Sequence, residues 1–175
     1  MKVLSSLAVI VAPQYAINIQ EAEEILGGLL YGLIQKDDLS KIELCLKDAD
    51  VVEQEINEAV EDFMKGDVTD ILAGVTVIGK LIQELPVDLK DCQGMESDIA
   101  RIEKWGEIFT DPTQLMQTVV QNLLTNYGAI FGDITKTSGD IAKADYYTAG
   151  EDIADVLVLT LGAVPQLDTL EVTQW

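Results

Sequence analysis

The sequence predicts an all-α protein: a single-domain bundle of about five to six helices, with short extended arms at the N- and C-termini. Apolar residues recur three and four positions apart through most of the chain, and this spacing places them on one face of a helix. Residues typical of helix ends separate the periodic segments. A chain of 175 residues, 48% of them hydrophobic, is long enough to bury the core of one domain.

The first helix is expected to begin after Asn18, because Asn18 and Glu21 have the spacing of a capping box. Gly28 and Gly32 lie one turn apart within it. Each glycine lowers the stability of a helix, so we interpret the pair as permitting close approach of another helix. A second, long helix is expected over residues 37–66, with a seam formed by Leu39, Ile42, Cys45, Ala49, Val52, Ile56, Ala59 and Phe63.

Proline and glycine divide the remainder of the chain. The third helix is expected to start at Val68 and end at Pro86, and a short turn then carries Cys92. A fourth helix is expected over residues 95–109. Asp111 and Pro112 are typical of a cap and a first turn.

That cap predicts a fifth helix over residues 112–134. A polar loop over residues 135–140 is expected to follow, and the last helix is expected over residues 146–161.

The charge of the chain restricts its partners. It has 31 acidic and 11 basic residues, which gives a formal net charge of −20. This field repels nucleic acids and anionic membranes, so neither is expected as a partner. It attracts calcium weakly without a dedicated site, although solubility at high concentration is the simpler interpretation.

The sequence contains no histidine and a single arginine, Arg101. The absence of histidine excludes Ser-His-Asp and Cys-His catalytic sets and the usual zinc ligands. One arginine is a poor basis for a bidentate clamp on phosphate. We therefore predict no enzyme, no catalytic residue, no cofactor and no metal-ligating residue.

Two acidic segments are candidates for metal sites, and neither has the pattern of one. Residues 133–140 have oxygen side chains at alternate positions, but the segment lacks the glycine and the glutamate of an EF-hand loop. Four further carboxylates lie at the start of the last helix, where the helix dipole accounts for them without a ligand: Asp145, Glu151, Asp152 and Asp155.

The N-terminus resembles a secretory signal, since Lys2 precedes about ten apolar or small residues. Cleavage is expected after Ala16. The alternative is a retained, β-prone arm. The expected organisation is thus a signal or arm over residues 1–16, a helical domain over residues 17–162 and an extended tail over residues 163–175.

Cys45 and Cys92 are the only cysteines. In a secreted protein an even number of cysteines favours a disulfide. In a cytosolic protein the same residues would be two buried thiols.

Several segments together resemble an uncharacterised group of small secreted helical proteins that are abundant in ciliated protists. The resemblance covers about residues 22–162 and rests on the two cysteines, on Glu84-Leu85-Pro86 and on residues 145–150. The matching segments are EEILGGLLYGL, KIELCLKDAD, GKLIQELPVDLKDCQGMESD, WGEIFTDPTQLMQTVVQNLL and ADYYTAGEDIADVL. The resemblance implies secretion and a Cys45–Cys92 disulfide, and it implies no activity.

Three functions are consistent with these features. The first is an acidic extracellular structural protein that self-associates into a filament or matrix, with strand exchange between apolar ends. The assembly candidates in those ends are Val9, Ile10, Val11, Leu170, Val172 and Trp175. The second function is a carrier of an apolar ligand within the bundle. The third is a matrix protein that responds weakly to calcium through its bulk charge.

Overall fold

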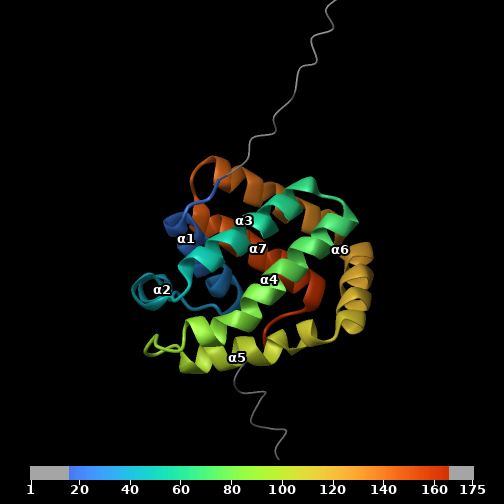
Figure 1. The fold of residues 1–175 in the computed structure, drawn as a ribbon. Coiled ribbons are helices and arrows are strands. Elements are labelled where there is room, and N and C mark those ends of the chain that lie inside the picture. Colours follow the sequence, from blue (N-terminus) through green and yellow to red (C-terminus); the bar gives the residue numbers. More distant parts are fainter. Residues whose placement is uncertain (1–15, 166–175) are drawn as a thin grey trace, which may run out of the picture.

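A computed structural model describes residues 16–165 (Figure 1). The described chain is helical, which confirms the expected class, but it has seven α-helices and one 3₁₀ turn where five to six helices were expected. In order they are α1 (Ile19–Ile34), α2 (Leu39–Cys45), α3 (Ala49–Lys65), α4 (Val68–Asp88), α5 (Glu96–Gly106), η1 (Glu107–Thr110), α6 (Pro112–Ala142) and α7 (Tyr146–Leu161).

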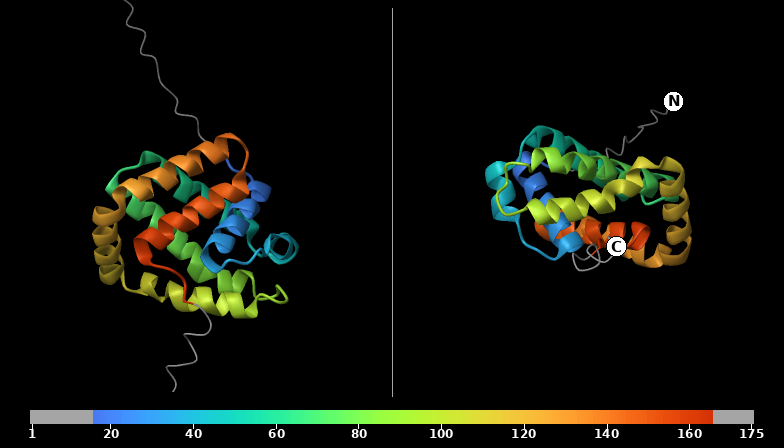
Figure 2. Two further views of the ribbon diagram at one scale, coloured as in Figure 1. Left: turned by 180° about the vertical axis from the view of Figure 1, so that it is seen from behind. Right: turned by 90° about the horizontal axis from the view of Figure 1, so that it is seen from below.

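The helices form two layers (Figures 1 and 2). Helices α3 and α4 pack as a pair in one layer, and α1 and α7 pack in the other. Helix α6 lies along one edge, chiefly against α7, while α2 lies at the opposite edge. The core between these elements is mostly aliphatic, and its largest fully buried side chains include Phe63, Leu29, Ile56, Ile78 and Ile82.

Glycines permit the close crossing of α1 and α7. A Cβ atom at Gly28 would lie 1.9 Å from the backbone oxygen of Tyr147, and one at Gly150 would lie 2.1 Å from that of Ile25. A Cβ at Gly32 would lie 2.4 Å from the Cβ of Ala154. The sequence-based interpretation of Gly28 and Gly32 is therefore confirmed, and α7 is the helix that approaches them.

The expected long helix over residues 37–66 was wrong, because the chain breaks between α2 and α3. Asp48 has a left-handed backbone with φ 51°. The N–H of Lys47 donates to the carbonyl of Asp88 at 3.2 Å, at the end of α4. This bond, made across the fold, replaces a helical one and holds the end of α2 beside the segment that follows α4.

The expected polar loop over residues 135–140 was also wrong, since these residues continue α6 to Ala142. The hydroxyl of Thr135 donates to the carbonyl of Phe131, and that of Thr137 donates to the carbonyl of Asp133. Each hydroxyl is thus satisfied by the preceding turn, so these residues remain helical. Pro86 likewise does not end its helix, because α4 continues to Asp88.

The six assembly candidates lie in residues 1–15 and 166–175, outside the described chain, as do the expected arms apart from residues 16 and 163–165. Within it, no helix is long and apolar enough to cross a membrane.

The α1–α7 crossing gives a first prediction. Gly28→Ala should lower the free energy of unfolding by at least about 2 kcal/mol, because its methyl group would overlap the backbone of α7. Denaturant unfolding followed by circular dichroism measures the change. The matched control is Gly139→Ala in α6, where the nearest atom is 4.0 Å from the added carbon; it should be neutral or stabilising by roughly 0.5–1 kcal/mol. Equal effects of the two substitutions would contradict the close crossing.

Candidate functional site

The disulfide lies at the α2 edge of the molecule. Cys45, the last residue of α2, is bonded to Cys92, and their Cα atoms are 5.4 Å apart. The expected pairing is confirmed. The bond closes a loop across 47 positions and fastens α2 to the turn after α4.

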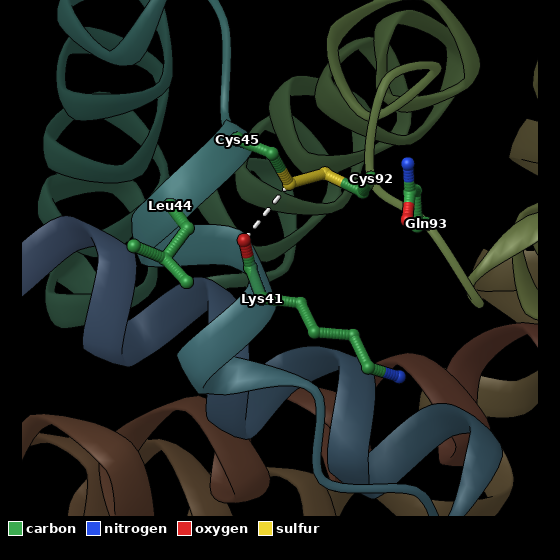
Figure 3. A pocket seen from close by; sticks show the side chains of 5 residues that line it. All are labelled: Lys41, Leu44, Cys45, Cys92 and Gln93. Carbon is green, nitrogen blue, oxygen red and sulfur yellow. Dashed lines mark hydrogen bonds between the residues drawn. A yellow bond between two sulfur atoms is a disulfide. The ribbon is translucent and has the colours of Figure 1, made fainter.

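A surface depression of about 290 Å³ adjoins the disulfide and is lined by Lys41, Leu44, Cys45, Cys92 and Gln93 (Figure 3). The carbonyl oxygen of Lys41 lies 2.8 Å from Cys45 Sγ. Lys41 Nζ is paired with Asp38 at 2.6 Å. Both sulfur atoms that line the depression belong to the disulfide, and the lysine that lines it is paired with Asp38.

The outer face of α6 combines exposed apolar side chains with an absence of charge. No charged residue occurs from Pro112 to Gly132, although 24% of the whole chain is charged. Met116 is 54% exposed and Leu124 is 80% exposed, while Leu115, Val119, Leu123 and Ile130 of the same segment are buried. We call the solvent-exposed side of residues 112–132 of α6 the uncharged helix face. It lies along the edge of the molecule opposite α2 (Figures 1 and 2).

Aromatic rings and glycines complete this face. Tyr127 and Phe131 stack with ring centroids 6.1 Å apart, and both are nearly half exposed. A Cβ placed on Gly128 or Gly132 would have no atom within 4 Å. These glycines are therefore not required for contacts within the described chain, in contrast to Gly28 and Gly150.

Three carboxylates meet between the second half of α6 and α7. One oxygen each from Asp133, Asp152 and Asp155 lies within 4.8 Å of the other two. Asp133 and Asp152 are both 8% exposed, whereas Asp155 is open to solvent. We call these three residues the carboxylate cluster.

Lysines neutralise only some of the negative charges in and around the carboxylate cluster. Lys136 Nζ lies 2.6 Å from Asp133 Oδ1, and Lys143 Nζ lies 2.9 Å from the neighbouring Asp140. Asp152 Oδ2 is buried without a hydrogen-bond partner. Among the described residues, no lysine ammonium lies within ion-pair distance of Asp152.

Two other buried carboxylates have a lysine beside them, whereas Asp88, at 5% exposure, has no ion pair in the described chain. Lys80 Nζ lies 2.6 Å from Glu55, and Lys41 Nζ lies 2.6 Å from Asp38. Asp152 therefore differs from these structural ion pairs. Burial raises the pKa of Asp152 to about 7, and the adjacent Asp140 carboxyl adds to the rise. Burial, followed by the charge of Asp133, also raises the pKa of Asp155.

The sequence placed Asp152 and Asp155 with Asp145 and Glu151 as dipole-stabilised residues, and the structure separates them. Asp145 does cap α7, since its side chain accepts from the N–H of Thr148 at 3.3 Å. Asp152 instead faces α6. The sequence around Asp152 gives little signal, because its neighbours on α7 include Glu151 and Asp155 as well as apolar residues. Its partner Asp133 was expected near the end of the fifth helix, and nothing in the sequence showed that the two helices would face each other there.

The model of the Secreted protein B-like family matches residues 6–161, so the chain belongs to that family. It is an extracellular, secreted protein with one disulfide. No curated protein and no solved structure matches the chain. The resemblance to proteins of ciliated protists stays a prediction.

The disulfide gives a second prediction. Its removal in a Cys45→Ala/Cys92→Ala double variant should lower the free energy of unfolding by about 4 kcal/mol, because the unfolded chain regains the entropy of a 47-position loop. Thermal unfolding with and without reductant checks this. Reductant should lower the Tm of the wild type and leave the Tm of the double variant unchanged. If reductant does not change the Tm of the wild type, the disulfide does not stabilise the fold.

The raised pKa of Asp152 gives a third prediction. A folded-state pKa of about 7 lies above the ordinary value of 3.8, so the stabilising contribution of this group is present below about pH 4 and is lost as the pH rises through 7. Asp152→Asn should therefore become progressively more stable than the wild type over this interval. The difference should be on the order of 1 kcal/mol, or roughly 2–4 °C in Tm, because solvent near Asp155 screens the repulsion.

Thermal melts of both proteins from about pH 4 to 8 measure this difference in Tm. Because distant groups titrate alike in the two proteins, their contributions cancel in the comparison. The groups facing Asp152 are Asp133, Lys136 and Asp140 from α6 and Asp155 from α7. A difference in Tm that does not change with pH would contradict the raised pKa.

Proposed function

We propose that this member of the Secreted protein B-like family is a non-enzymatic, acidic structural protein of the extracellular space that associates with further copies of itself. The observation that carries the proposal is the uncharged helix face of α6, with Met116, Leu124, Tyr127 and Phe131 exposed on it. The occupant proposed for this face is the same face of a second copy.

Charge favours a second copy at this place. Two chains that each carry a formal charge of −20 repel one another over most of their surfaces. The uncharged helix face belongs to a 21-residue segment that adds no charge to such an encounter. Depletion of charge together with exposed aromatic and methionine side chains is typical of the centres of protein interfaces.

Steric access supports the same arrangement. Gly128 and Gly132 are one turn apart, and the space above each is open. A helix from another copy could approach the backbone of α6 there as closely as α7 approaches α1 at Gly28. The neighbouring side chain of Leu124 projects farther into solvent, at 80% exposure, and would be buried by the approaching helix.

The terminal segments supply a second mode of association. Cleavage after Ala16 would remove Val9, Ile10 and Val11 from the mature protein, which leaves Leu170, Val172 and Trp175 as apolar contacts outside the described residues. A tail of this composition could pair as a strand with a neighbouring copy. Such pairing would extend a dimer formed through α6 into a polymer.

The apolar-carrier alternative receives less support from the fold. The aliphatic side chains that suggested it pack against one another in a continuous core. The depression at the disulfide is lined partly by Lys41 and Gln93, which are polar. Organic extraction of the secreted protein followed by mass spectrometry tests for a bound apolar ligand.

Leu124→Gln supplies the fourth prediction. Loss of the buried leucine should weaken self-association roughly ten- to hundred-fold, since burying such a side chain contributes about 1.5–3 kcal/mol. Sedimentation velocity of the disulfide-bonded protein over a range of concentrations, at about 0.15 M salt to screen charge, measures the effect. The monomer should fold normally.

The matched control is Leu44→Gln, which makes the same chemical change at a side chain 88% exposed on the opposite edge. It should leave the association constant unchanged. A wild type that remains monomeric at every concentration would refute self-association. If Leu124→Gln has no effect while deletion of residues 170–175 abolishes association, the tail rather than α6 forms the contact.

A further inference from the structure

The carboxylate cluster joins two helices that the chain brings together from separate segments. Asp133 lies in α6, and Asp152 and Asp155 lie in α7. One oxygen from each falls within 4.8 Å of the other two. Oxygens at this separation can contact a common cation, whose ligand distances to carboxylate oxygens are about 2.0–2.6 Å.

Asp152 provides a second observation that points to a ligand. Its side chain is 8% exposed, and no hydrogen-bond donor reaches its buried Oδ2 atom. The adjacent Asp140 carboxyl can share a hydrogen bond with Asp152 only while one of the two is protonated. A buried ionised oxygen without a partner is strongly destabilising, so proteins pair such groups or place a metal ion beside them. Dipole stabilisation at the start of α7 does not satisfy this atom, because it faces α6.

The lysines leave room for a cation. Lys136 contacts Oδ1 of Asp133, and Lys143 contacts Asp140. Counting Asp140 with the three cluster residues, these lysines leave two of four carboxylate charges uncompensated. The exposed carboxylate of Asp155 provides a route by which an ion could enter from solvent.

We propose that Asp133, Asp152 and Asp155 form a binding site for one hard divalent cation, of which calcium is the best fit. All the ligand atoms are carboxylate oxygens, which suit calcium and magnesium and give no selectivity for metals that prefer imidazole or thiolate. Calcium accepts irregular geometry and water ligands more readily than magnesium does. Solvent at Asp155 would complete the coordination.

This inference departs from the expectation, drawn from the sequence, that no residue binds a metal. It also differs from weak attraction of calcium by bulk charge, because it assigns binding to three named side chains. It does not depend on self-association. The bound ion would connect α6 to α7 and stabilise the folded monomer, since a ligand that binds only the folded state raises its stability.

The experiment uses the full secreted, disulfide-bonded protein, stripped with EDTA and dialysed at about pH 8. Calcium is titrated at constant ionic strength while heat of binding and Tm are followed, and magnesium is titrated in parallel. The wild type should bind one calcium ion with a Kd on the order of 10⁻⁴–10⁻³ M, the range of extracellular calcium modules. Its Tm should rise and then saturate.

Asp155→Asn is the principal variant, because Asp155 is exposed and its change does not disturb the core. It should weaken calcium binding at least ten-fold. Asp152→Asn should also lose binding, while its Tm in EDTA equals or exceeds that of the wild type. The matched control is Glu103→Gln on α5, an exposed residue whose substitution removes the same charge; its calcium affinity should equal that of the wild type.

Three results would contradict the proposal. A wild type without saturable binding up to about 10 mM calcium, well above the expected Kd, would show that the cluster does not bind the ion. An equal loss of affinity in Glu103→Gln and Asp155→Asn would show that bulk charge, not the cluster, attracts the ion. Tighter binding of magnesium than of calcium would refute the assignment to calcium.

Discussion

Helices α1 and α7 cross so closely at Gly28 and Gly150 that a methyl group at either position would overlap backbone atoms of the other helix. The other contacts build outward from this pair. Helix α7 also carries the main contact surface for α6, and α1 packs against α3 and α2. The crossing therefore sets both the position of Asp152 against Asp133 on one side and, through α2, the position of Cys45 near Cys92 on the other.

Local signals made much of this architecture predictable. The Asn18 capping box, the Asp111 cap and the paired glycines of α1 act within one turn or between adjacent faces, and each is present as expected. The break before α3 could not be read locally, because it depends on the bond from Lys47 to Asp88 across the fold. The cluster was missed for the same reason: Asp152 is explained by its own helix until Asp133 is known to face it.

Helix α6 is divided by charge into two parts with different roles. Its first 21 residues contain no charged side chain and expose apolar groups, whereas residues 133–143 contain two aspartates and two lysines. The first half also packs on the fold, since Val119 and Leu123 are buried and Asn122 donates to a carbonyl of α7. Its exposed apolar side chains, such as Leu124, make no such contact and are available for a partner.

Ion binding at the carboxylate cluster would affect local stability, whereas assembly would depend on the net charge of the whole chain. One divalent ion offsets only two of a net twenty negative charges, so site binding by itself changes repulsion between copies very little. Its effect is local: at a concentration about ten times Kd, a single site stabilises the folded chain by about 1.4 kcal/mol. Repulsion between copies falls instead with total ionic strength, whichever cation supplies it. A stability gain specific to divalent ions at constant ionic strength therefore belongs to the cluster, and an association gain common to all salts belongs to the surface as a whole.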